Sequence, residues 1–381
     1  MNPNDVAAAR EQTGKPLQVP FNDLAFQWRA IQKEATREID RVFATSAFCL
    51  GPQVEAFERE IAMWLGVRHA IGVNSGTSAL HLATVAAGIG ANDEVLLPAH
   101  TFVATAWGVV YAGGTPVLCD VDAATGTVDL GDAERRVTSR TKAIIPVHLY
   151  GQPADMSAVC AFADRHGLVV IEDAAQSLGA CWNGKQTATI GRYGCVSFYP
   201  GKNLGAAGEA GLIVTNDDDT RLRRLRNHGQ SERYIHDEIG FNYRLDGLQA
   251  AVLRHKLKHM ATWTLQRKVL AAAYTEGLDG LPLELPRVVN QDHVWHLYVV
   301  RTPQRDALQE HLRQRNIETG LHYPVPLNRQ PCLARYVDPK SAYPESDRWA
   351  REALSLPLFI GMTPQQQAHV VASVRDFFRH G

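Results

Sequence analysis

The residues most able to do chemistry stand where buried strands are expected to give way to loops. Lys202 lies in the Gly- and Pro-bounded loop of SFYPGKNLGAAGEAG, and Asp173 ends the apolar run LVVIED. A lysine amine can attack an aldehyde, and a carboxylate can keep a ring nitrogen protonated because its negative charge favours the cationic form. These residue types indicate covalent chemistry on a heterocyclic aldehyde. Each also has a simpler explanation, a solvated loop lysine and a helix N-cap.

A phosphate site is indicated where the run HAIGV (69–73) continues through Ser75, Gly76 and Thr77 into a helical pattern. Free N–H groups at a helix N-terminus, with small hydroxyl side chains beside them, can hold a phosphate. A plain N-cap would show the same residues, because serine and threonine are favoured there in any helix.

Three further residues complete a ligand site for one cofactor. Phe102 follows the run EVLLP (94–98), where its ring could lie against a flat ligand or simply pack in the core. Gln176 follows Asp173 by one helical turn, and Ser197 precedes the loop lysine. Pyridoxal 5'-phosphate requires a lysine for its aldehyde, an acid for its pyridine nitrogen and donors for its phosphate. The combination therefore predicts this cofactor.

The elements that must position these residues are visible as short apolar runs, rich in valine and isoleucine, that alternate with helix-like stretches. Continuous apolarity marks strands covered on both faces, and the intervening helices supply the crossovers that parallel strands need. The pattern predicts an α/β fold with a mostly parallel sheet, whose ligands lie beyond the carboxyl ends of the strands. The runs lie at 69–73, 94–98, 116–120, 143–147, 168–173, 195–199 and 211–215.

The length of 381 residues exceeds a usual single core and predicts two domains. Residues 1–17 show no strong pattern and are expected to form a flexible N-terminal arm. A large cofactor-binding α/β domain is expected over 18–250 and a small α+β domain over 251–381, linked by one long helix over about 246–274. The small domain should contain a strand and two helices, at 294–302, from near Gln304 to near Asn316, and after Pro364.

The composition argues against several classes of function. Lysine and arginine number 39 against 40 acidic residues, so no positive excess favours nucleic acid as a partner. The six cysteines lack the paired spacings of zinc sites, and no metal is predicted. The chain shows no apolar leader and no run of eighteen apolar residues, so we expect a cytoplasmic protein without a membrane partner.

The ordered motifs resemble the DegT/StrS-type sugar aminotransferases, a fold-type I pyridoxal-phosphate family, from about Val19 to the C-terminus. The resemblance implies an aspartate-aminotransferase-like fold and a transaminase activity. It is carried by VNSGTSALHLA, PAHTFVATA, PVHLYGQPADM, IEDAAQSLGA, SFYPGKNLGAAGEAG, GFNYRLDGLQAAVL and TGLHYPVPL. Two departures, Ala207 to Gly211 after the lysine motif and Leu178 in place of a frequent histidine, bear on the substrate side.

The resemblance implies a role for each residue around the cofactor ring. Lys202 would carry pyridoxal phosphate as a Schiff base, and Asp173 would lie on the pyridine nitrogen. Gln176 would lie near the ring hydroxyl, and Phe102 would stack on the ring.

The same resemblance implies that Gly76, Thr77 and Ser197 bind the phosphate. An asparagine equivalent to Asn242 reaches the phosphate from the neighbouring subunit in this family. A homodimer with shared active sites is therefore implied.

The implied reaction moves an amino group from L-glutamate, released as 2-oxoglutarate, to a nucleotide-linked keto-sugar, with pyridoxamine phosphate formed between the two halves. The PGKNLG loop resembles enzymes that aminate sugar C3, which favours a dTDP-3-keto-6-deoxyhexose over a UDP-linked 3-keto-sugar or a 4-keto-sugar. Candidate sugar contacts are Tyr234, His322 and Tyr323. Related dehydratases replace the lysine with histidine, and a non-catalytic sensory protein would lack part of the lysine, aspartate and phosphate set, which is complete here.

Overall fold

A computed structural model of the chain describes residues 17–289, 292–338 and 340–380. Its centre is a seven-stranded sheet with the order β1-β9-β8-β5-β4-β2-β3. Only β9 is antiparallel to its neighbours, so the other six strands run in one direction and the predicted mostly parallel sheet is confirmed. The strands are His69–Val73 (β1), Glu94–Pro98 (β2), Thr115–Cys119 (β3), Thr141–Ile144 (β4), Val169–Asp173 (β5), Tyr193–Ser197 (β8) and Gly211–Thr215 (β9).

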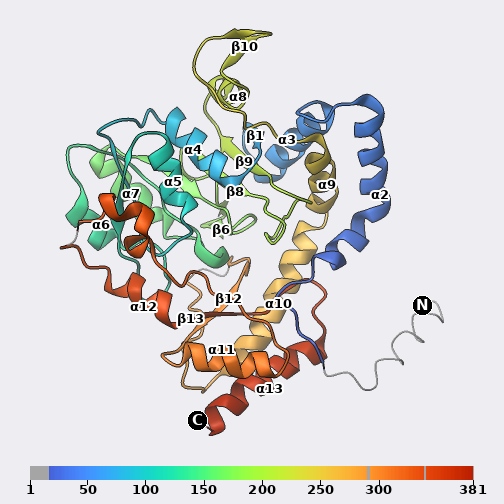
Figure 1. The fold of residues 1–381 in the computed structure, drawn as a ribbon, viewed down its shortest axis with the longest axis vertical. Helices are drawn as coiled ribbons and strands as arrows, with labels where there is room; N and C mark the ends of the chain where they lie inside the picture. The colour runs from blue at the N-terminus through green and yellow to red at the C-terminus, as the bar shows by residue number, and fades with distance from the viewer. Residues whose placement is uncertain (1–16, 290–291, 339, 381) are drawn as a thin grey trace.

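Helices cover both faces of this sheet, which explains why its strands are apolar on both sides (Figure 1). One face packs against α4 and α5, and the other packs against α3, α9 and α7. The helices of this part are Leu24–Thr45 (α2), Pro52–Leu65 (α3), Gly76–Ala86 (α4), Ala104–Tyr111 (α5), Leu130–Arg136 (α6), Met156–His166 (α7), Thr220–Leu225 (α8) and Gly247–Leu257 (α9).

Local sequence signals fix several of these helix ends. Asp23 and Asp155 accept hydrogen bonds from backbone N–H groups in the first turns of α2 and α7. Gly66 and Gly167 end α3 and α7 in the left-handed conformation that glycine adopts without strain. These caps place the helices where the apolar pattern predicts them.

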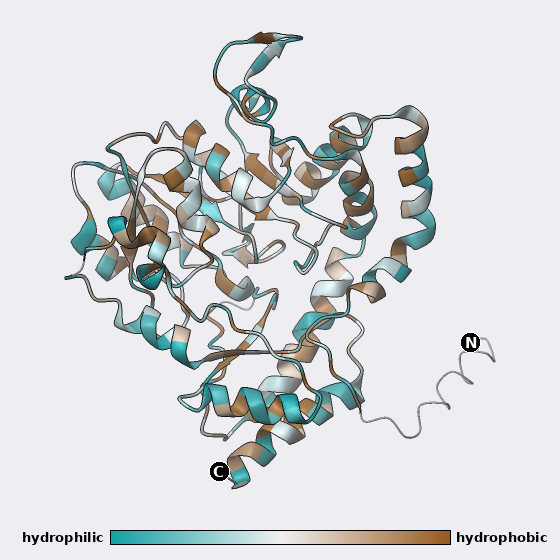
Figure 2. Ribbon diagram, in the orientation of Figure 1, coloured by the Kyte–Doolittle hydropathy of each residue, from teal (hydrophilic) through white to brown (hydrophobic). Residues whose placement is uncertain are grey.

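The C-terminal elements have a core of their own, in which Tyr274, Tyr298, Leu308 and Phe359 are buried together. Figure 2 shows hydrophilic residues along much of α11, at the periphery of this part. The proposed division into domains at residue 250 stays a prediction. The elements are Met260–Leu278 (α10), Tyr298–Arg301 (β12), Arg305–Gln314 (α11), Pro344–Glu352 (α12), Ala353–Leu356 (β13) and Pro364–His380 (α13).

Two predicted elements differ from the structure, and a third lies almost wholly outside the described residues. The single helix over 246–274 is wrong, because α9 ends at Leu257 and α10 begins at Met260, with a turn closed by the His259 N–H on the Lys256 carbonyl. The strand expected at 294–302 is shorter, and residues 294–297 precede β12. The predicted flexible arm lies outside the described residues except for Leu17.

Short elements connect the main ones. None of the helices described is long and apolar enough to cross a membrane. The short elements are the hairpins Cys181–Trp182 with Lys185–Gln186 (β6, β7) and Gln230–Glu232 with Ile235–His236 (β10, β11), and the 3-10 turns Leu149–Gly151, Leu327–Arg329 and Pro331–Tyr336.

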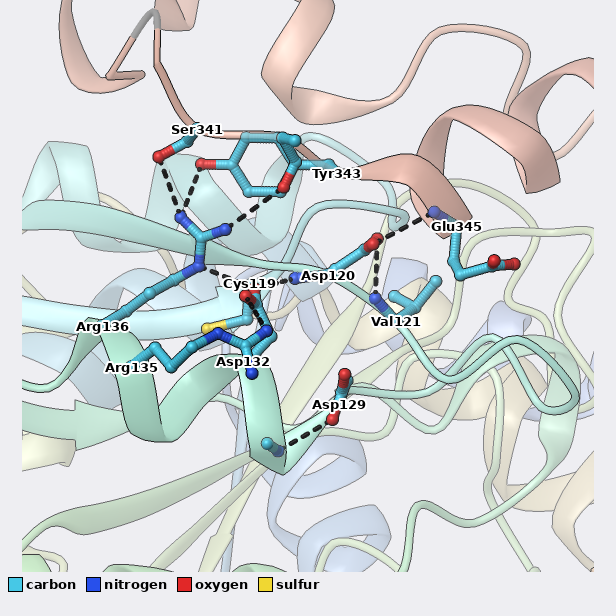
Figure 3. Close-up of polar contacts among 12 residues, drawn as sticks. Cys119, Asp120, Val121, Asp129, Asp132, Arg135, Arg136, Ser341, Tyr343 and Glu345 are labelled. Atoms are coloured by element: carbon cyan, nitrogen blue, oxygen red, sulfur yellow. Dashed lines mark hydrogen bonds and ion pairs between the residues drawn. The ribbon is translucent and has the colours of Figure 1, made fainter.

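A polar cluster joins the edge of the sheet to α12 (Figure 3). Asp120, directly after β3, accepts hydrogen bonds from the backbone N–H groups of Glu345 and Ser346 and from the Ser346 hydroxyl, at 2.7–3.0 Å. Arg136 donates to Asp132 and lies 4.5 Å from the centre of the Tyr343 ring. Asp120 therefore caps α12 from another part of the chain.

Replacing Asp120 with alanine should lower the free energy of unfolding by about 2 kcal/mol, because the helix cap is lost and buried Ser346 loses a partner. Urea titration would measure this change. The matched variant Asp306→Ala, whose side chain is 85% exposed, should lower it by less than about 1 kcal/mol. Equal effects would contradict the capping role.

Candidate active site

The loops that carry the predicted site residues meet at one edge of the sheet because β1, β2, β5 and β8 run in the same direction. A cavity of about 770 Å³ lies at this edge. Nine of the eleven predicted site residues line it, namely Gly76, Thr77, Phe102, Asp173, Gln176, Ser197, Lys202, His322 and Tyr323.

Asp173 is the last residue of β5, and its carboxylate faces the cavity. It accepts hydrogen bonds of 2.8 Å from the Thr105 hydroxyl and 3.1 Å from the Ala175 N–H. Burial raises the pKa of Asp173, while these two bonds and the charge of Lys202 act in the opposite direction. Residues 175–179 form turns and no helix follows Asp173, so the alternative of a helix N-cap is wrong.

The neighbouring carboxylate points the other way, because successive strand residues face opposite sides of a sheet. Glu172 is fully buried and accepts hydrogen bonds from His148 and from the backbone N–H groups of Ala188, Ile190 and Gly191. Glu172 therefore stabilises the turn at residues 188–191. Asp173 is the carboxylate that faces the cavity.

Lys202 is carried by a tight loop whose ends are joined by a 2.8 Å hydrogen bond from the Ala206 N–H to the Phe198 carbonyl. Its own N–H donates to the Tyr199 carbonyl at 2.8 Å. Burial lowers the pKa of Lys202 to about 8, although the charge of Asp173 opposes this shift. The alternative of a solvated loop lysine is wrong, because Lys202 lines the cavity and its charge interacts with that of Asp173.

The lowered pKa predicts the pH dependence of Lys202 as a nucleophile. Only the neutral amine attacks an aldehyde, so cofactor-free protein should react with pyridoxal phosphate at a rate that rises with pH and levels off above about 8. Absorbance near roughly 410–430 nm would follow the reaction. A rate that still rises between pH 9 and about 10.4, as for an exposed lysine, would contradict the prediction.

The predicted phosphate cradle lies where β1 meets α4. Ser75 is the N-cap of α4, since its hydroxyl accepts the Ser78 N–H at 3.0 Å, so the N-cap explanation holds for this residue. Gly76 is different, because a Cβ added there would lie 2.7 Å from the Cβ of Ser197. The first N–H groups of a helix have no intrahelical acceptor, so those of Gly76 and Thr77 are free for an anion.

The wall of the cavity combines residues from both halves of the chain. Phe102 is 50% exposed, and its ring centre lies 5.4 Å from that of Tyr323. Gln176 accepts the Tyr150 N–H at 2.6 Å and donates to the Tyr323 hydroxyl at 3.0 Å. These bonds fix the orientation of the Gln176 amide. The simpler explanation, that Phe102 packs in the core, is wrong because its ring is half exposed.

His322 lies beside these residues, with its ring stacked on Phe21 at 5.7 Å and its Nδ1 2.8 Å from the Ser355 hydroxyl. Burial and, to a smaller extent, the charge of Lys202 lower the pKa of His322 to about 4. His322 is therefore neutral at physiological pH.

Tyr234 and Asn242 do not line the cavity. Tyr234 is 77% exposed in the β10–β11 hairpin, which projects from the top of the molecule in Figure 1. Asn242 is exposed and pairs with Asn227 at the base of the same segment. Within this chain, neither residue meets the other predicted site residues.

Two residues near the site were not predicted. Thr105 lies one helical turn after Thr101 in HTFVATA, and this spacing was the signal that could have indicated it. His296 lines the cavity, and burial followed by the charge of Lys202 lowers its pKa. It lies within the run 294–302, whose apolar pattern predicts a strand and gives no sign of a site residue.

The residues present fit pyridoxal phosphate. The cavity brings together a lysine with a lowered pKa, a buried carboxylate, an exposed aromatic face and a helix N-terminus in which only glycine leaves room at position 76. Together with the sheet topology, this site defines a pyridoxal-phosphate-dependent enzyme of fold type I. The chain belongs to the DegT/DnrJ/EryC1/StrS aminotransferase family, whose model matches residues 29–375.

Known proteins agree with this membership. A pleiotropic regulatory protein of Geobacillus stearothermophilus is 44% identical over 370 residues, covering 96% of this chain and 100% of the relative. A dTDP-3-amino-3,4,6-trideoxy-alpha-D-glucose transaminase of Streptomyces venezuelae is 44% identical over 363 residues, covering 94% and 96%. The crystal structure of S. venezuelae DesV with a ketimine intermediate has a TM-score of 0.92 at 44% identity, covering 95% of this chain and 99% of that chain. This protein is a pyridoxal-phosphate-dependent sugar aminotransferase.

Proposed function

We propose that this protein transfers an amino group from L-glutamate to C3 of a dTDP-linked 3-keto-6-deoxyhexose in the cytoplasm. The observation that carries the proposal is the convergence of Lys202 and Asp173 in one cavity, where their charges interact. The similarity to the S. venezuelae transaminase supports the choice of a dTDP-linked 3-keto-sugar. A sensory role alone is less well supported, because the lysine, the acid and the phosphate cradle are all present.

Each residue has a proposed task when the cofactor is bound. Pyridoxal phosphate supplies an electron sink for the charge that develops on the α-carbon of the amino donor. Lys202 would hold the cofactor by its aldehyde, and the Lys202 amine would carry the proton between the α-carbon of the donor and C4′ of the cofactor. Asp173 would keep the pyridine nitrogen protonated, and Phe102 would lie against the ring.

The remaining proposed contacts are with the phosphate and ring hydroxyl of the cofactor and with the sugar substrate. We propose that Gly76, Thr77 and Ser197 bind the phosphate and that Gln176 lies near the ring hydroxyl. We propose His322 and Tyr323 as sugar contacts, since both line the cavity.

We further propose a homodimer in which Asn242 and Tyr234 act in the neighbouring active site. Both residues are exposed and lie outside the cavity of their own chain, which supports a role in the site of another chain. The described residues that line the cavity include Lys202 and no arginine, whereas glutamate and a nucleoside diphosphate are both anionic. Further cationic groups from a second copy would balance this charge.

The decisive experiment presents purified enzyme with L-glutamate and, in separate reactions, dTDP- and UDP-linked 3-keto and 4-keto sugars. The aminated products would be identified by mass spectrometry and NMR. We expect the highest kcat/KM for the dTDP-linked 3-keto sugar. Turnover confined to 4-keto sugars would overturn the C3 assignment, and preference for the UDP-linked sugar would overturn the nucleotide assignment.

A further inference from the structure

Lys256 is a buried cation that takes no part in the chemistry proposed above. It lies in the last turn of α9, is 5% exposed, and donates a 2.7 Å hydrogen bond from its amine to the carbonyl oxygen of Gly205. Leu253 and Leu257 on the same helix and Leu204 in the lysine loop belong to one hydrophobic cluster. A leucine or methionine could fill such a position without the desolvation that a buried charge requires.

The acceptor of this hydrogen bond lies in the loop that carries Lys202. A Cβ added to Gly205 would lie 2.1 Å from the carbonyl oxygen of Pro200, so the chain turns back too closely for any side chain. Directly after this point, the loop closes through the Ala206 N–H on Phe198. The hydrogen bond from Lys256 to the Gly205 carbonyl therefore joins α9 to the tightest part of the loop.

The helix contacts the loop a second time through Gln249, which accepts the Ala207 N–H at 2.9 Å. This bond is exposed, whereas that of Lys256 is buried. The buried bond is thus the one protected from competition with water, and it is the stronger constraint on the loop.

We propose that Lys256 is a positioning residue, whose hydrogen bond to Gly205 fixes the loop so that the Lys202 amine points into the cavity. The inference rests on the proposed role of Lys202. Lys256 itself does not line the cavity and acts only through the loop backbone. Burial lowers the pKa of Lys256 to about 8, so at pH 7 its amine is charged and its burial opposes folding.

The test compares wild-type and Lys256→Met proteins in their cofactor-free form at pH 7. One measurement is the melting temperature. The other is the rate at which added pyridoxal phosphate becomes attached to Lys202, trapped with borohydride and located by peptide mass spectrometry. We expect a melting temperature equal to or above that of the wild type, with attachment slower by about tenfold or more because the amine is misplaced.

Two variants serve as controls. Lys258→Met removes an exposed lysine from the end of the same helix and should leave both measurements unchanged. Lys256→Arg keeps a cationic donor and should attach the cofactor faster than Lys256→Met.

Attachment by Lys256→Met at the wild-type rate would overturn the inference. A melting temperature several degrees below that of the wild type would also overturn it, because Lys256 would then serve the fold. Wild-type protein that becomes labelled at other lysines and not at Lys202 would instead refute the role proposed for Lys202. The two failures are therefore distinguishable.

Discussion

The Lys202→Ala protein is expected to lose turnover by about 10⁴-fold, the upper end of the effect of removing a general acid–base group. The alanine variant has neither an amine to hold the cofactor covalently nor a base to move the proton. Steady-state kinetics with glutamate and the keto-sugar would measure the loss. The variant should still bind pyridoxamine phosphate, because the phosphate cradle and Asp173 are unchanged. Turnover within tenfold of the wild type would exclude Lys202 as the catalytic base.

The same variant tests whether the active sites are shared between subunits. If Asn242 acts in the neighbouring site, a hybrid of Lys202→Ala and Asn242→Asp chains has one site with both native residues. We expect the Asn242→Asp protein to be inactive as well, and random mixing of the two proteins should then restore about a quarter of wild-type activity, because half of the dimers are hybrids with one intact site each. Absence of any recovery from confirmed hybrids would place Asn242 in its own chain's site.

Replacing Asp173 with asparagine is expected to lower kcat by about 10²- to 10³-fold, the effect of removing one preorganised electrostatic group. The amide has the same shape and can still accept the Thr105 hydrogen bond, but it carries no negative charge to keep the pyridine nitrogen protonated. The effect should fall on kcat more than on KM, because the charge matters when electrons move into the ring.

The control for this variant is Asp164→Asn, an exposed aspartate on α7, which should keep wild-type kinetics. The melting temperature of each protein separates loss of charge from loss of folding. An Asp173→Asn enzyme with wild-type kcat at an unchanged melting temperature would show that another group protonates the ring.

The central sheet could be predicted from the sequence because strands buried on both faces consist of continuous runs of apolar residues. All seven predicted runs overlap a strand, and the motifs at their ends contain Asp173, Lys202 and Gly76, which line the cavity. The run 195–199 is displaced by two residues from β8, since Phe198 and Tyr199 continue its apolarity into the lysine loop. Apolarity alone does not distinguish a buried strand from a buried turn.

The break between α9 and α10 could not be predicted from the local pattern. No proline or glycine marks residues 258–259, and the helical periodicity continues across them. The turn is closed by the His259 N–H and accompanied by stacking of His259 on Trp263 at 5.1 Å. Neither contact alters the spacing of apolar residues, which is the pattern from which a helix is predicted.

The sequence by itself determined the class of fold, the cofactor and the chemical groups of the site, because periodicity, turn residues and ordered motifs are local properties of the chain. Tertiary structure alone decided which partners those groups have. Thr105 reaches Asp173 across 68 positions, and Lys256 reaches Gly205 across 51. Such pairings depend on how strands and helices pack against one another. Packing brings together residues that are far apart in the sequence, and the local sequence pattern does not indicate which of them will be in contact.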